Sequence, residues 1–540
     1  MKIGKGIFAG LSILALSTIP LHSTFSSEGS SPSDNDEQNG DGAVDNVIFM
    51  IPDGFATSYA TNYRLYKDGD EPIWDDMLTG MMKTVSANDP ITDSAAAGTA
   101  MATGEKTDNG MISMSPDGEE LGTILQAAEE AGKSSGLVAT STVTHATPAT
   151  FGAHTENRND EHLIAPQYLE NDVDVVLGGG KNTFLPESEG GLQEERHLIN
   201  EFEEEGYQFV EDSDQLQAAE SEKVLGLFAD DAMAPELERE QTNEPSLAEM
   251  TETAIDTLDQ NEDGFFLMVE GSQIDWAGHA NDSAWAMSDT EAFEEAVTEA
   301  VDFANEDEET LVVMAGDHDT GGMTVGGYDT GGTQLEILHD VNNTGGYIAG
   351  QLNSDQSNAR DVMLEYANIE ITDDEVEAIQ TSDEPDLAIN HIISNYAGVG
   401  WSSYDHTGQE VPLYAHGPGS EMFTGLVDNT DVPKSMAEAM NIPLGQESEE
   451  PAEPSIDQLQ TQVEELLSEG AIADDETARH LQTHLTSVGH YEETGSTDQA
   501  IEHMNGFKEL LEGLSGEELI SEEAYESLNA AADELIEQRG

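Results

Sequence analysis

Short apolar runs recur through the first 444 residues, and they limit the possible folds more than any other feature of the sequence. Helical patterns separate them, and the runs are residues 46–51, 136–139, 173–177, 265–269 and 311–315. Hydrophobic strands of this kind are typical of parallel sheets that helices cover on both faces. We therefore predict an α/β domain over residues 44–444 with a mainly parallel central sheet. The acidic stretch 185–244 has a mostly helical pattern and is expected to form surface insertions.

Polar residues that could bind a metal ion follow several of these runs. Asp53 follows the first run, Glu270 the fourth and Asp317 the fifth. Because open α/β sheets bind their ligands beyond the carboxyl ends of the strands, we expect these side chains to meet at one edge. Further candidates nearby in the sequence, or in a later loop, are Asp275, His279, His318 and His406.

The candidate set contains only carboxylates and imidazoles, since the chain has no cysteine. Asp275 and His279 are four residues apart, so on a helical turn they face the same side and could bind one ion. Carboxylate and imidazole ligands suit catalytic zinc, whereas magnesium prefers an oxygen-rich corner. Together the candidates supply enough ligands for two or three metal ions.

A serine stands at the start of a run of small residues. Asp93-Ser94-Ala95 lies inside the segment 92–104, which consists mostly of Ala, Gly and Thr. The pattern predicts a helix that begins near Ser94, where free N–H groups and the positive end of the helix dipole suit an alkoxide and a bound phosphate. Small side chains would let this helix pack closely against the sheet edge. The alternative is that Ser94 is an ordinary N-cap residue.

These motifs resemble those of the alkaline phosphatases, most closely the branch found in Bacillus and related secreted enzymes. The resemblance covers residues 46 to about 425. In chain order the matching motifs are Asp53-Gly54, Asp93-Ser94-Ala95, Thr144-His-Ala-Thr-Pro148 with Arg158 downstream, Glu270-Gly-Ser-Gln-Ile-Asp275 with His279, Asp317-His318, and His406-Thr-Gly408.

The resemblance implies a secreted phosphomonoesterase that acts through a phosphoserine, with two zinc ions and one magnesium ion per chain. It assigns the first zinc to Asp275, His279 and His406, and the second zinc to Asp53, Asp317 and His318. It assigns the magnesium ion to Asp53, Thr147 and Glu270. Ser94 would be the nucleophile, and Arg158 would hold the phosphate with two hydrogen bonds. The implied partners are small phosphomonoesters.

Three more residues are expected near the site. Asp93 precedes the implied nucleophile. His145 stands where some family members have Asp, which implies a looser magnesium site. Trp276 stands where others have Lys or His near the phosphate, which predicts weaker retention of the product.

Other classes of protein fit the sequence less well. A sulfatase needs a Cys or Ser in the pattern Cys/Ser-x-Pro-x-Arg, which the chain does not contain. A phosphodiesterase of the same superfamily shares the two-metal core but usually lacks the third metal site, so Thr147, Glu270 and Arg158 favour the monoesterase. A non-enzymatic acidic surface protein is the third alternative, and only the C-terminal region supports it.

The two ends of the chain differ from the catalytic region. Residues 1–25 are typical of a signal peptide, which predicts export to the periplasm or the medium. Residues 26–43 are expected to form an acidic disordered linker and residues 445–455 a second linker. Residues 456–540 have helical periodicity and predict a small accessory helical bundle. No segment is expected to span a membrane, and a homodimer is left open.

The charge of the chain is extreme. It contains 112 acidic residues against 17 Lys and Arg, which gives a net charge of −95. Such a surface repels nucleic acid, so we expect no nucleic-acid partner. Self-repulsion at this density destabilises a compact state unless salt screens it. Because the acids are spread along the whole chain, we interpret the composition as an adaptation to high salt.

Overall fold

The computed structural model describes residues 44–67, 70–327, 332–444, 456–468, 471–473, 475–493, 497–516 and 519–539. The expected signal peptide (1–25) and the two expected linkers (26–43 and 445–455) lie outside the described residues.

A ten-stranded sheet forms the centre of the region 44–444, in the order β14-β2-β13-β8-β1-β7-β3-β4-β6-β5. Its strands are β1 (Asn46–Pro52), β2 (Leu78–Lys83), β3 (Ser134–Thr142), β4 (Val175–Gly179), β5 (Gln208–Val210), β6 (Val224–Leu227), β7 (Phe265–Gly271), β8 (Thr310–Ala315), β13 (Val411–His416) and β14 (Gly425–Asp428). Every neighbouring pair from β8 to β5 is parallel. The predicted α/β class is therefore confirmed, and β1, β3, β4, β7 and β8 correspond to the five apolar runs.

One part of the sheet differs from the sequence-based expectation, and one strand makes it mainly rather than wholly parallel. The stretch 185–244 was expected to form surface insertions, but it supplies β5 and β6, which extend the parallel sheet at one edge. These strands have only three and four residues, too few for a periodic pattern to show in an acidic background. At the other side of the sheet, β13 runs antiparallel to both β8 and β2.

Helices cover both faces of the sheet, and β1 shows how the faces are divided. Successive side chains of a strand point to opposite faces. Ile48 and Met50 pack in one core with residues of α1 (Thr57–Tyr66), α9 (Leu247–Leu258) and α11 (Ser283–Asp307). Val47 and Phe49 pack in the other with α2 (Ser94–Thr103), α3 (Ile124–Glu130), α4 (Ala146–Gly152), α5 (Glu161–Glu170) and α16 (Asp431–Met440). An apolar strand covered on both faces is thus the physical origin of the uninterrupted runs.

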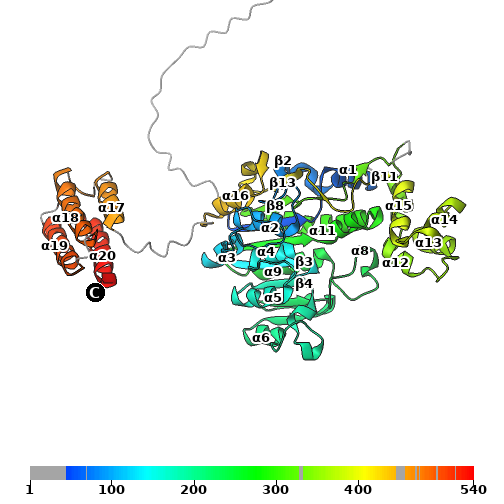
Figure 1. Cartoon of the computed structure of the whole chain (residues 1–540), viewed down its shortest axis with the longest axis horizontal. Coiled ribbons are helices and arrows are strands. Elements are labelled where there is room, and N and C mark those ends of the chain that lie inside the picture. Colours follow the sequence, from blue (N-terminus) through cyan, green and yellow to red (C-terminus); the bar gives the residue numbers. More distant parts are fainter. Residues whose placement is uncertain are drawn as a thin grey trace, which may run out of the picture. The chain divides into compact units, whose positions relative to one another are not determined.

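The remaining elements connect or decorate this core. Four helices gather to one side of the sheet (Figure 1), namely α12 (Gly345–Gly350), α13 (Ala359–Ala367), α14 (Asp373–Thr381) and α15 (Pro385–Ala397). Shorter helices are α6 (Leu198–Glu204), α7 (Ser213–Leu216), α8 (Glu236–Arg239) and α10 (Gln273–His279). Two small antiparallel ribbons pair β9 (Asp319–Thr320) with β12 (His406–Thr407), and β10 (Thr324–Val325) with β11 (Val399–Gly400).

The C-terminal region is helical, as expected. Its helices are α17 (Ile456–Ser468), α18 (Asp475–Glu493), α19 (Thr497–Gly516) and α20 (Glu522–Arg539). They share an apolar core of their own, in which Leu481, Phe507 and Leu535 are fully buried. Within the described part of the chain, none of the helices combines the length and the apolar character needed to cross a membrane.

Candidate active site

Ser94 is the first residue of helix α2, directly after the N-cap residue Asp93. The whole helix is buried, which its small side chains allow. A Cβ atom on Gly98 would lie 2.6 Å from Oγ1 of Thr150 in α4, so a larger residue would force the two helices apart. The small-residue run therefore brings α2 close to its neighbour and holds the Ser94 hydroxyl at the sheet edge.

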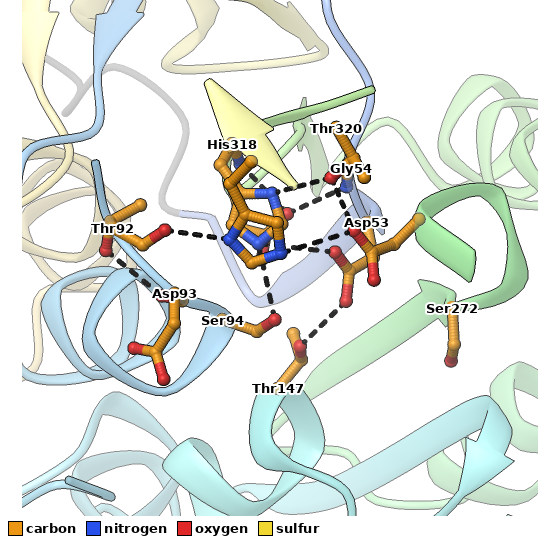
Figure 2. A network of polar contacts seen from close by, with 12 residues as sticks. Asp53, Gly54, Thr92, Asp93, Ser94, Thr147, Ser272, His318 and Thr320 are labelled. Carbon is orange, nitrogen blue, oxygen red and sulfur yellow. Dashed lines mark hydrogen bonds and ion pairs between the residues drawn. The ribbon is translucent and has the colours of Figure 1, made fainter. Parts of the chain in front are cut away.

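The buried imidazole of His318 lies at the centre of the site (Figure 2). Its Nε2 atom lies 3.3 Å from Oγ of Ser94, 3.0 Å from Oδ2 of Asp317 and 3.7 Å from Oδ1 of Asp53. Asp53 follows β1 in a turn where Gly54 has a φ of 75°, and a Cβ atom on Gly54 would lie 2.8 Å from the backbone of Asp275. Only glycine satisfies both conditions. Asp53, Asp317 and His318 together form one group that could hold an ion.

A second group lies beside the first. Nε2 of His279, the last residue of α10, lies 3.4 Å from Oδ2 of Asp275 and 3.2 Å from Nε2 of His406. His406 is brought here by the β9–β12 ribbon, in which it pairs with Thr320. The His406 and His318 rings are stacked with centroids 3.5 Å apart, so the two groups are contiguous. Asp275, His318 and His406 also offer ligand atoms within 4.8 Å of one another.

Backbone carbonyls fix both outer imidazoles. Nδ1 of His279 lies 2.6 Å from the carbonyl oxygen of Tyr404, and Nδ1 of His406 lies 2.8 Å from that of Thr92. A carbonyl can only accept, so Nδ1 of each ring carries a proton and Nε2 is the atom left to bind a metal ion. This arrangement is the one that a metal-binding histidine needs.

A third group is richer in oxygen. Asp53, His145 and Glu270 offer ligand atoms within 4.8 Å of one another. Thr147, in the first turn of α4, donates to Oδ2 of Asp53 over 3.3 Å. Asp53 therefore faces two groups at once, with its Oδ2 toward Thr147 and its Oδ1 toward His318.

The donor set fits bound cations. Oδ1 of Asp53 and Oε1 of Glu270 are buried without a hydrogen-bond partner. A buried acceptor left unpaired is costly, and a divalent cation would satisfy both atoms. Each of the two groups that contain these atoms has two carboxylates and one imidazole, which are donors that zinc and magnesium can both use.

The pKa values of the buried side chains reflect the many carboxylates in the site. Burial, together with the neighbouring Asp317, raises the pKa of Asp53 well above its usual value. Burial likewise raises the pKa of Glu270 to about 7. Burial and the nearby charge of His318 lower the pKa of His406 to about 4, so its ring is neutral near pH 7. Bound cations would offset the cost of keeping these carboxylates ionised.

The guanidinium of Arg158 lies between Asp93 and His145. Its Nη1 donates to Oδ2 of Asp93 over 2.9 Å, and its Nη2 lies 3.3 Å from Nε2 of His145. Burial and the charge of Arg158 lower the pKa of His145 to about 4, so the ring is neutral and can accept from the guanidinium. Trp276 packs edge-on against His145, with ring centroids 5.9 Å apart.

The structure also adds residues that sequence reasoning missed. The hydroxyl of Thr320 bonds Oδ1 of Asp275 and lies 3.2 Å from Nδ1 of His318 (Figure 2). The hydroxyl of Ser272 bonds Glu270. Both follow a candidate ligand by two residues, but Ser and Thr are so common that this spacing alone carries no signal.

Ionisable groups of this kind, gathered at the carboxyl edge of a parallel sheet around a buried hydroxyl, are those of a metal-dependent hydrolase. The comparisons with known proteins narrow the class. The family model for alkaline phosphatase matches residues 44–442. The chain therefore belongs to the alkaline phosphatase family, whose members are metal-dependent hydrolases of phosphate monoesters. A second model, for the FIMAH domain, matches residues 456–537.

Individual relatives agree with this assignment. Alkaline phosphatase 4 of Bacillus subtilis is 43% identical over 410 residues, which are 72% of this chain and 87% of that protein. The crystal structure of a cold-active alkaline phosphatase from Shewanella sp. is 32% identical, with a TM-score of 0.67, and the match covers 73% of this chain and 99% of that one. A histidine-to-aspartate variant of the alkaline phosphatase from the Antarctic bacterium TAB5, with Mg bound, is 27% identical, with a TM-score of 0.57, over 74% of this chain and 99% of that one.

Proposed function

We propose that the protein hydrolyses phosphate monoesters in two steps, with Ser94 as the nucleophile. The observation that carries the proposal is the position of the Ser94 hydroxyl, at a helix N-terminus and 3.3 Å from Nε2 of His318, beside buried carboxylates. Ser94 is the first residue of α2, so the positive end of the helix dipole favours the negative charge of a phosphoryl group on it.

The proposed metal ligands overlap the three groups of possible ligands in the structure, except that His279 replaces His318 in one set and Thr147 replaces His145 in another. Two zinc ions would be held by Asp275, His279 and His406 and by Asp53, Asp317 and His318, and one magnesium ion by Asp53, Thr147 and Glu270. When bound, such ions lower the pKa of a coordinated hydroxyl and offset the charge that develops on phosphate oxygens. The unpartnered atoms Oδ1 of Asp53 and Oε1 of Glu270 support this assignment. The magnesium-bound relative supports the third ion.

In the first step, Oγ of Ser94 attacks phosphorus in line with the ester oxygen. The Oγ–P bond forms, the bond between phosphorus and the ester oxygen breaks, and the alcohol leaves with a proton. In the second step, water attacks the phosphoserine, the Oγ–P bond breaks, and inorganic phosphate is released. Arg158 holds the phosphate oxygens, and its contacts with Asp93 and His145 keep the guanidinium in place between steps.

His145 and Trp276 set how firmly the site holds its ligands. His145 is neutral and occupies a position in the third group, so it adds no negative charge for magnesium. Trp276 provides an aromatic edge rather than a cation near the phosphate. We therefore expect a looser magnesium site and weaker retention of phosphate than Asp and Lys at these positions would give.

We further propose that the protein is exported and adapted to high salt. Support for export comes from the composition of residues 1–25, and support for salt adaptation from the net charge of −95. We divide the chain into a signal peptide (1–25), a linker (26–43), a catalytic domain (44–444), a second linker (445–455) and a helical accessory domain (456–540). A homodimer is compatible with this proposal.

The decisive experiment compares a chromogenic phosphomonoester, a bis-ester and a sulfate ester, with and without a chelator. We expect the monoester to be hydrolysed fastest, chelation to abolish turnover, and zinc with magnesium to restore it. Acid quenching should trap phosphate on Ser94, and Ser94→Ala should lose several orders of magnitude in turnover while it keeps its fold and metal content. Active enzyme with fewer than two tightly bound divalent ions per chain would contradict the site assignment.

A further inference from the structure

The side chain of Ser272 connects the ends of β7 and β3 beside Glu270. Ser272 is fully buried and directly follows β7. Its Oγ lies 2.6 Å from Oε2 of Glu270 and accepts from the backbone N–H of Ser141 over 3.0 Å. Its own N–H donates to Oγ1 of Thr140 over 3.1 Å. The parallel pairing of β3 and β7 ends at Ala139 and Glu270, so Ser272 continues the connection after the ladder stops.

When Glu270 is ionised, the hydrogen atoms favour one arrangement. A serine hydroxyl has a single proton to donate, and a carboxylate oxygen can only accept. A metal-binding Glu270 is ionised, so the Ser272 proton goes to its Oε2, which at 2.6 Å is the shorter contact and is charge-assisted. The alternative acceptor, Oγ of Ser141, lies 3.0 Å away and can donate its own proton to the carbonyl oxygen of Thr142.

This bond decides which oxygen of Glu270 is free. Oε2 also lies 3.4 Å from Oγ of Ser141, so the oxygens of both hydroxyl groups lie near the same carboxylate oxygen. Oε1 is buried and has no hydrogen-bond partner. Glu270 offers a ligand atom within 4.8 Å of those of Asp53 and His145. The carboxylate is therefore held by one oxygen and leaves the other for a ligand.

We propose that Ser272 is a positioning residue for the magnesium ligand Glu270, which it holds with Oε1 free for the ion. The inference rests on the magnesium assignment of the proposed function. Hydrogen bonds to metal-binding carboxylates typically change metal affinity by about 10- to 100-fold when they are lost. The hydrogen bonds of Ser272 go to Glu270, Ser141 and Thr140, and not to Ser94 or to a proposed zinc ligand. We therefore expect zinc binding to be unaffected.

The test is Mg²⁺ affinity, measured by calorimetric titration of MgCl2 into zinc-restored enzyme after chelation. Ser272→Ala should weaken Mg²⁺ binding by about 10- to 100-fold, with unchanged zinc content by elemental analysis. The matched control is Thr140→Val, which removes the other hydrogen bond at the same junction and leaves Glu270 untouched. It should change Mg²⁺ affinity less than about 3-fold.

The outcomes separate the inference from its premise. If the wild-type protein binds no Mg²⁺, the proposed magnesium site is wrong. If it does bind Mg²⁺ and Ser272→Ala binds it equally well, or Thr140→Val loses as much affinity, only the positioning role is overturned. Should Ser272→Ala not fold, Ser272→Cys keeps the shape with a weaker donor. That variant should bind Mg²⁺ several-fold more weakly, and wild-type affinity would overturn the inference.

Discussion

Asp93 orders two parts of the site with the two oxygens of one carboxylate. Oδ1 accepts from the backbone N–H of Ala96 over 3.0 Å and caps helix α2, while Oδ2 accepts from Nη1 of Arg158 over 2.9 Å. The helix that presents Ser94 and the side chain proposed to hold the phosphate are thus fixed to the same residue.

Substitutions at Asp93 should separate these two roles. Asp93→Asn keeps an oxygen for the cap but loses the charge that holds Arg158, so inhibition by inorganic phosphate should weaken several-fold with little change in melting temperature. Asp93→Ala also loses the cap, which costs about 1 kcal/mol of stability. Thermal melts and phosphate inhibition constants test this. Equal melting temperatures for the two variants would contradict the capping role.

A cation at position 276 should strengthen product binding. Trp276→Lys places a positive charge near the phosphate, and inhibition by inorganic phosphate should tighten by roughly 3- to 10-fold, about 1 kcal/mol. Trp276→Phe is the control, because it keeps an aromatic ring against His145 without adding charge. Steady-state inhibition measures both. If Phe tightens inhibition as much as Lys, the effect comes from space rather than from charge.

An anion at position 145 should strengthen magnesium binding. His145 is neutral at the pH of the assay, since its pKa is lowered to about 4 by burial and by Arg158. His145→Asp adds a negative charge to the third group, so Mg²⁺ affinity should rise by roughly 10-fold. His145→Asn adds an oxygen without the charge and serves as the control. Calorimetric titration with MgCl2 measures the Mg²⁺ affinity of each variant. An unchanged affinity in His145→Asp would contradict the proposed effect of charge at position 145.

Replacing Glu129 should stabilise the protein at alkaline pH. Burial raises the pKa of Glu129 from 4.5 to about 8, although a hydrogen bond from Ser135 opposes the shift. The unfolded chain releases this proton near pH 4.5 and the folded protein near pH 8. The stability contribution is therefore complete below pH 4.5 and is lost as the pH rises to 8. Glu129→Gln should raise the melting temperature at pH 9 by roughly 1–3 °C.

Two controls accompany the Glu129 measurement. At pH 4.5 the difference between Glu129→Gln and the wild-type protein should shrink, because Glu129 is then protonated in the folded protein and about half protonated in the unfolded chain. The exposed neighbour Glu130 provides a charge-matched control variant, Glu130→Gln. If the difference in melting temperature between Glu129→Gln and the wild-type protein is the same at pH 4.5 and pH 9, the prediction is wrong.

Salt should stabilise the protein through its surface rather than its site. The four proposed carboxylate ligands are a small part of the 112 acidic residues. The remaining charges repel over a Debye length of about 30 Å at 0.01 M salt and about 3 Å at 1 M. Melting temperature should rise steadily with NaCl over this range, whereas sucrose, which does not screen charge, should have a much smaller effect. A flat melting temperature in NaCl would refute the salt adaptation and leave the phosphatase family unaffected.

The sequence by itself determined the class of fold, because a strand buried on both faces must be apolar along its length, as β1 is between Val47 and Phe49. It could not reveal β5 and β6, which are too short to show a period. Sequence motifs predicted the candidate ligands, but the fold of the sheet determines which of them lie close together. His406 reaches His318 only through the β9–β12 ribbon.

The supporting hydroxyls were decided by the tertiary structure alone. Ser272 and Ser141 are separated by 131 positions in the chain, and Thr320 and Asp275 by 45. A hydroxyl has no strong preference for an element or a partner, so its role depends on which groups the fold brings within hydrogen-bond distance. Ligand residues can be recognised from local spacing, whereas the residues that hold them are defined only by contacts between distant segments.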